Sequence, residues 1–163
     1  MLVTLFLLSG HNNLSAGTTK HAAAGLQYRN AERGITLVVP NSWAPQPRTN
    51  EGVSFAGSNG CFVSVLSHLM FVPTSVYQRS VQIVITKAYP GQVYMPDSSW
   101  QGSERPDGAV HADLKAHNGT TVSQNYIHFR RGISVVSLIE SWPARALDCP
   151  AQMAVIEKSF HLD

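Results

Sequence analysis

The segment that most limits the fold of this chain is 133–139, Ile-Ser-Val-Val-Ser-Leu-Ile. Apolar residues occupy both sets of alternating positions, whereas a strand with one face in water carries them on one set only. A strand at 133–139 must therefore lie inside a sheet that is covered on both faces. We expect a layer of helix or loop against each face.

Two turn signals place this segment in a three-stranded antiparallel meander. Asn118-Gly119 has the composition of a two-residue type I′ turn, and Gly132 marks a second turn. The expected strands are at about 109–117, 120–130 and 132–142.

The assumed turn at Asn118-Gly119 also predicts which side chains share a face, because neighbouring strands are then paired residue by residue. One face of the meander is expected to carry Val110, Ala112, Leu114, Ile127, Val136 and Leu138. The other is expected to carry His111, Val122, Tyr126, Ile133, Val135 and Ile139.

Four further strands are expected before the meander, at about 26–30, 35–39, 53–56 and 62–70. The first two form a hairpin, Pro40 stops the second, and Trp43 fills an apolar corner. A helix opens after Pro73 and ends near Tyr89, with Tyr77, Val81, Val84, Ile85 and Ala88 on one stripe. Because Val81, Ile83 and Ile85 also alternate, a strand is the alternative for this segment.

The region 92–108 is rich in Pro, Gly, Ser and Asp, and predicts loop with a short strand at 99–102. A final helix is expected from Asp148, with Met153, Ile156 and Phe160 on its buried face.

The first 25 residues differ in composition from the rest. An apolar run, 2–8, precedes a small-residue site at Leu14-Ser15-Ala16, which resembles a secretory signal without its basic start. The alternatives are a mis-assigned start or an extra N-terminal strand. We expect 1–25 to be a signal-like segment with a flexible lead-in from Gly17, and 26–163 to be one domain. After processing, no stable membrane span is expected.

The amino-acid composition indicates which classes of function to expect. Hydrophobic residues make up 44% of the 163-residue chain and charged residues 13%, which is typical of a compact globular domain. The formal net charge of +2 is small and scattered, so we do not expect nucleic acid as a partner.

Taken together, the elements resemble the PsbP-like fold, as found in small PsbP- and DcrB-type bacterial proteins and in domains appended to exported metalloproteases. The resemblance covers about 26–162 and rests on Tyr28-Arg-Asn-Ala, Gly34-Ile-Thr-Leu-Val-Val-Pro-Asn-Ser-Trp43, Val53-Ser-Phe-Ala56 and Ile156-Glu-Lys-Ser-Phe160. It implies an α+β, three-layer α/β/α sandwich with a central antiparallel sheet. It also implies a domain that binds, assembles or chaperones other proteins without catalysis or a cofactor.

The sequence contains few motifs for catalysis or ligand binding. The sequence has no His-Glu-x-x-His, nucleophile elbow, phosphate loop or Cys-x-x-Cys. His111, Asp113 and His128 are weak metal candidates if they share a sheet face, although ordinary histidines explain them better. Arg130, Arg131 and His128 form a candidate site for an anionic partner, with a solvated turn as the alternative.

Cys61 and Cys149 are the only cysteines. Each lies at the end of an expected element, and in an oxidising compartment a pair is usually bridged, so we predict a disulfide. The alternative is two buried thiols that pack as small hydrophobic side chains.

Three functions follow. The first is an exported, periplasmic or secreted, non-catalytic domain that acts in protein binding or assembly at the bacterial cell envelope. The second is a cytosolic DcrB-like chaperone or adaptor for a secreted effector. The third is a metal-dependent or hydrolytic enzyme that uses the histidine-bearing sheet face. The sequence does not define the partner or the oligomeric state.

Overall fold

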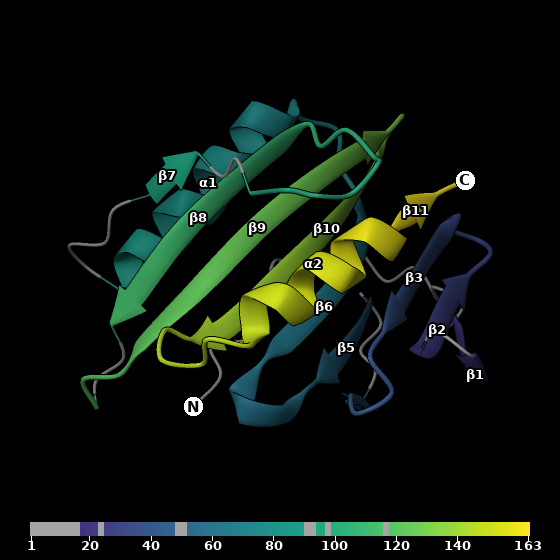
Figure 1. The fold of residues 1–163 in the computed structure, drawn as a ribbon. Coiled ribbons are helices and arrows are strands. Elements are labelled where there is room, and N and C mark those ends of the chain that lie inside the picture. The colour runs from purple at the N-terminus through teal and green to yellow at the C-terminus, as the bar shows by residue number, and fades with distance from the viewer. Residues whose placement is uncertain (1–16, 23–24, 48–51, 90–93, 97–98, 116–117) are drawn as a thin grey trace.

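The computed structural model describes residues 17–22, 25–47, 52–89, 94–96, 99–115 and 118–163. Two helices and two antiparallel sheets make up this part of the chain (Figure 1). The strands are β1 (Thr18–Ala22), β2 (Gly25–Asn30), β3 (Ile35–Val39), β4 (Ala44–Pro45), β5 (Gly52–Ala56), β6 (Phe62–Leu69), β7 (Tyr94–Pro96), β8 (Gly108–Lys115), β9 (Thr121–Arg131), β10 (Ser134–Pro143) and β11 (His161–Leu162). The helical elements are η1 (Ser58–Gly60), α1 (Thr74–Ala88) and α2 (Cys149–Ser159).

The larger sheet has seven strands in the order β4-β5-β6-β10-β9-β8-β7. Strand β10, which contains most of the segment 133–139, lies in the middle of it, as the two-sided apolar pattern predicts. Val135, Val136 and Leu138 are each 2% exposed or less, although they point to opposite faces. The central antiparallel sheet and its coverage on both faces are confirmed.

Helix α1 covers one face of this sheet, and its buried stripe explains why the segment is a helix. Tyr77, Val81 and Ile85 are spaced four residues apart and are all buried, whereas Ile83 is 48% exposed. They pack with Ala112, Leu114, Tyr126 and Val135 from β8, β9 and β10. The strand alternative for 74–88 is therefore wrong.

The other face is covered by α2 together with the smaller sheet, whose strand order is β1-β2-β3-β11 (Figure 1). Met153 and Ile156 of α2 and Leu37 of β3 share one core cluster with Leu138. The Ser159 hydroxyl accepts a hydrogen bond from the Val38 amide at 2.9 Å and fastens the end of α2 to β3. The hairpin predicted at 26–30 and 35–39 thus belongs to a second sheet, which forms part of the covering layer.

Two other expectations are wrong. The flexible lead-in predicted from Gly17 to Gly25 is ordered at 18–22, because Thr18–Ala22 pairs along β2. The domain therefore begins before residue 26, while the apolar run 2–8 lies outside the described residues. The short strand predicted at 99–102 does not form, and the edge strand of this region is β7 instead.

The register of β8 on β9 also differs from the prediction. Lys115 pairs with Thr121, so five residues separate the two strands, whereas a type I′ turn would leave only two between them. Compared with the predicted two-residue loop, a loop of five residues shifts the pairing of β8 with β9 by one residue. Each side chain of β8 therefore lies on the opposite face of the sheet from the predicted one. Ala112 and Leu114 therefore face α1, together with Tyr126, and His111 faces the α2 side.

A disulfide joins Cys61 to Cys149, with 5.6 Å between their Cα atoms. Both residues are at most 1% exposed. Beside the bridge, the Asn59 amide donates to the Asp148 carboxylate at 3.1 and 3.3 Å. These contacts tie the turn before β6 to the first residue of α2.

Candidate protein-binding surface

The predicted metal candidates do not share a face of the sheet. His111 and Asp113 lie on the α2 side of β8, whereas His128 lies under α1, because the register differs by one residue from the predicted one. No group of three or more His, Cys, Asp or Glu in the described ranges is arranged to hold a metal ion.

On the α2 side, His111 belongs to a chain of polar side chains that crosses three strands. His111 Nδ1 lies 2.7 Å from Asn125 Oδ1, and the Asn125 amide donates to Glu140 Oε2 at 3.0 Å. The Ser123 hydroxyl donates to Asp113 at 2.6 Å. Glu140 and Asn125 are almost fully buried. These hydrogen bonds give polar side chains partners within the sheet. The order in which the side chains are bonded is not that of a nucleophile activated by a base.

His128 is 1% exposed, so it cannot meet a partner at the surface. Its Nδ1 lies 2.9 Å from the Ser137 hydroxyl, and the Tyr77 ring packs edge-on against it. Burial, and secondarily the charge of His68, lowers the pKa of His128 from 6.5 to about 4. The histidine is therefore a neutral core residue at pH 7.

The two arginines predicted to receive an anion have other contacts. The Arg130 guanidinium donates to the carbonyl oxygens of Val72 at 2.6 Å, Gly132 at 2.9 Å and Met70 at 3.4 Å. Arg131 pairs with Glu104 at 3.1 Å. The predicted anion site at Arg130, Arg131 and His128 is therefore not assembled, and Arg130 instead holds neighbouring backbone.

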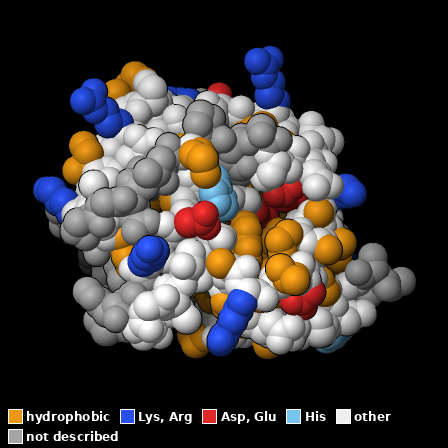
Figure 2. Space-filling view, turned by 60° about the vertical axis from the view of Figure 1, so that its left-hand side comes forward, with side chains coloured by type: hydrophobic (Ala, Val, Ile, Leu, Met, Phe, Trp, Pro, Cys, Tyr) orange, Lys and Arg blue, Asp and Glu red, His pale blue; other side chains and the backbone are white. Residues whose placement is uncertain are grey.

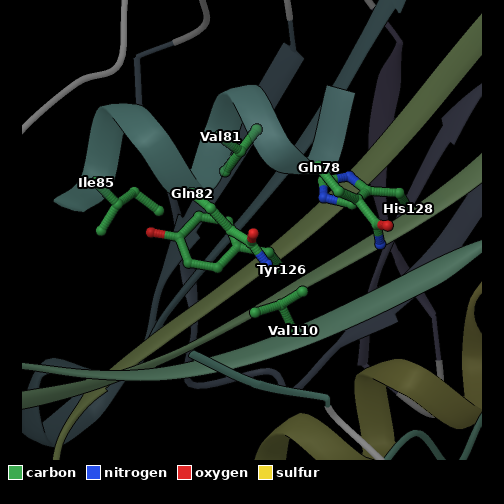
Figure 3. Close-up of a pocket in the computed structure, with 7 residues that line it drawn as sticks. All are labelled: Gln78, Val81, Gln82, Ile85, Val110, Tyr126 and His128. Carbon is green, nitrogen blue, oxygen red and sulfur yellow. The ribbon is translucent and has the colours of Figure 1, made fainter. Parts of the chain in front are cut away.

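A narrow space lies between α1 and the sheet, and Figure 3 shows the side chains that line it. Gln78, Val81, Gln82 and Ile85 point down from α1 toward Val110, Tyr126 and His128. The volume open to a water-sized molecule is about 0 Å³, whereas small-molecule sites begin at roughly 300 Å³. The side chains therefore leave little room for a ligand.

A different feature stands out at the end of the sheet where β6 leads into α1 and β9 turns into β10. Five large apolar side chains are exposed here, and we call them the sheet-end surface: Leu69 (40%), Phe71 (79%), Val72 (43%), Val76 (48%) and Ile133 (52%). They are five of the nine exposed large hydrophobic side chains among the described residues. Such a concentration marks an interaction site more often than scattered apolar residues do.

The backbone beneath the sheet-end surface is held in place. The Met70 amide donates to the Ile133 carbonyl at 2.6 Å, which joins the β6–α1 connection to the β9–β10 turn. Arg130 adds its bonds to the carbonyls of Met70, Val72 and Gly132. The exposed side chains therefore stand on a segment whose conformation is fixed before any partner arrives.

Sequence reasoning missed this surface, although a signal was present. Leu69, Met70, Phe71 and Val72 are consecutive apolar residues that continue past a strand into the start of a helix. A strand buries alternate residues, so such a run must expose some of them where it leaves the sheet.

The other four exposed large hydrophobic side chains among the described residues are Ile83, Met95, Leu147 and Val155. On the face shown in Figure 2, Lys and Arg side chains lie singly and do not gather into a patch. None of the helices in the described part of the chain has the length and apolarity that crossing a membrane requires.

The comparisons with known proteins identify the fold. No family model and no curated protein matches the sequence. A solved structure of a mutant form of the protein Mog1 matches with a TM-score of 0.56 at 13% identity, over 91% of this chain and 96% of that one. The solution structure of cyanobacterial PsbP (CyanoP) from Synechocystis sp. PCC 6803 matches with a TM-score of 0.53 at 13% identity, over 96% of this chain and 99% of that one. The PsbP-like fold is confirmed.

Proposed function

We propose that this chain is a non-catalytic protein-binding domain that docks its partner through the sheet-end surface. The observation that carries the proposal is the gathering of Leu69, Phe71, Val72, Val76 and Ile133 at one end of the sheet. Exposed apolar side chains lower solubility, and their burial becomes favourable when a partner covers them.

The shape of the surface favours a protein partner over a small molecule. Phe71 is 79% exposed, so it projects from the surface and does not line a cavity. An aromatic residue on a rigid backbone acts as an anchor when it enters a pocket of another protein. Phe71 is therefore the residue expected to contribute most to the binding free energy.

We propose further that the domain acts outside the cytosol, at the cell envelope. The Cys61–Cys149 disulfide supports this location, because structural disulfides persist in oxidising compartments. The apolar run at 2–8 supports it as well, because it resembles a secretory signal. The cytosolic chaperone or adaptor would instead keep both cysteines reduced, so thiol titration of protein from its native compartment separates the two.

The binding proposal is tested by cross-linking the full chain to its partner in native extracts and then measuring affinity for the purified partner. Phe71→Ala should weaken binding by about 2 kcal/mol, the threshold that defines a hot spot. Leu147→Ala is the matched control, because Leu147 is 87% exposed in the connection between β10 and α2. Equal affinities for Phe71→Ala and Leu147→Ala would remove the sheet-end surface as the docking site.

A further inference from the structure

The segment of sequence that forms most of the sheet-end surface contains basic residues but no acidic ones. Between Glu51 and Asp97 the chain contains no Asp or Glu, and its only Lys and Arg are Arg79 and Lys87. Both basic residues belong to α1, the helix that begins beside the sheet-end surface. The segment that provides most of the apolar side chains is therefore purely basic in its formal charge.

The two basic side chains continue the sheet-end surface along α1. Val76, Arg79, Ile83 and Lys87 recur at the spacing of one helix face, on the side opposite the buried stripe. Ile83 is 48% exposed and Arg79 and Lys87 are exposed as well. Apolar and basic side chains therefore alternate along a single outward face of about three turns.

The basic charges on this face are available for a partner. Arg79 and Lys87 make no hydrogen bond or ion pair within the described ranges. Among the described residues, two carboxylates near the β9–β10 turn are engaged elsewhere, since Glu104 pairs with Arg131 and Asp107 accepts the Arg130 amide at 2.5 Å. Neither carboxylate makes a bond to α1.

From this charge pattern we infer that the partner presents an acidic segment with apolar anchors, which lies along the outward face of α1 and ends on Phe71. The inference rests on the proposed function and adds the chemistry of the partner. Carboxylates of the partner pair with Arg79 and Lys87, while its apolar side chains cover Val76 and Ile83. Charged pairs at such a rim steer association and give it a dependence on salt.

A membrane with anionic lipids offers similar charge, but the structure favours a protein. Each basic residue raises affinity for an anionic bilayer only about fivefold, and this face carries two of them. Stable membrane binding from the surface needs a larger basic cluster together with an extended apolar face.

The test uses a displayed library of random peptides selected on the immobilised full chain. Selected peptides should combine Asp or Glu with aromatic or aliphatic residues. Their affinity, measured by fluorescence anisotropy, should fall about tenfold in the double variant Arg79→Glu/Lys87→Glu and should weaken as salt increases. Lys158→Glu is the control, because Lys158 is an exposed basic residue on α2.

The possible results separate this inference from the proposed function. Peptides that depend on Phe71 but carry no acidic residues would overturn the inference and leave the docking surface intact. Failure to select any peptide whose binding is lost in Phe71→Ala would contradict both. Binding to phosphatidylserine vesicles but not to phosphatidylcholine vesicles, lost in Arg79→Glu/Lys87→Glu and without any acidic peptide selected, would overturn the inference in favour of a membrane.

Discussion

His128 Nδ1 lies 2.9 Å from the Ser137 hydroxyl, across the central strand pair β9 and β10 and beneath α1. Both residues are at most 1% exposed, so the histidine must stay neutral to keep its place in the core. His68 and His128 both pack against the Tyr77 ring, with centroids 5.1 and 5.0 Å away. The contact between α1 and the sheet therefore contains a group that titrates.

Stability should fall as the pH drops below 6.5. The pKa of His128 is lowered to about 4 in the folded protein, so between these values the unfolded chain binds more protons than the folded one. The free energy of unfolding should decrease by about 1 kcal/mol from pH 7.5 to 5.5 and by about 3 kcal/mol by pH 4. Urea unfolding at these pH values measures the change.

The control for this pH dependence is a pair of variants. His128→Asn retains a polar group for Ser137 but does not titrate, so it should flatten the dependence between pH 7.5 and 5.5. His21→Asn is the matched control, because His21 is an exposed histidine on β1, outside the contact between α1 and the sheet. An unchanged slope in His128→Asn would show that another group is responsible.

Reduction of the disulfide should destabilise the fold substantially. Cys61 and Cys149 lie 88 positions apart, and in the chain-entropy model closing a loop of that length contributes about 4.6 kcal/mol. The double variant Cys61→Ala/Cys149→Ala should lose a similar amount in urea unfolding. Wild-type protein with dithiothreitol should behave like this variant, whereas equal stability with and without dithiothreitol would argue against a structural bridge.

Val136→Asp should cost about 3 kcal/mol or more, because it buries an unpaired charge in the centre of the sheet. Val136 is 2% exposed. Ile133→Asp, three residues earlier, is the comparison. Ile133 is 52% exposed, so the carboxylate of the introduced aspartate would stay in water. Thermal unfolding should separate the two variants by about 6–12 °C. Similar melting temperatures would contradict the position of β10.

Glu104 connects parts of the chain that are far apart in sequence. Its Oε1 accepts the Leu162 amide at 3.1 Å and lies 2.8 Å from His161 Nδ1, while Oε2 meets Arg131 at 3.1 Å. Glu104→Ala should cost about 1–3 kcal/mol by leaving the Leu162 amide without its acceptor. Glu104→Gln keeps that acceptor and should cost less, and chemical unfolding of both variants tests the order.

Much of the fold could be predicted because its signals are local. The alternation at 133–139 requires coverage on two faces, and the spacing of Tyr77, Val81 and Ile85 marks the stripe of α1. The final helix likewise begins just after Asp148, as its sequence suggests. These patterns depend on which residues follow one another, and the same periodicities appear in the structure.

The strand register and the candidate site could not be predicted, because they depend on loop length and on contacts between residues far apart in sequence. The β8–β9 loop has five residues between paired positions, although Asn118-Gly119 favours a two-residue turn, and this one-residue difference separates His111 from His128. Likewise, the roles of Arg130 and Arg131 depend on carbonyl and carboxylate groups far away in sequence. The candidate site was therefore harder to predict than the fold.

The place of β11 in the smaller sheet has a consequence for biosynthesis. Residues 161–162 pair with Ile35 and Thr36 of β3, so one edge of an early strand is covered by residues that the ribosome adds after all other described strands. A nascent chain that still lacks them has an open edge on β3, available to chaperones or to pairing with other chains. The smaller sheet is therefore completed only after translation has passed Leu162.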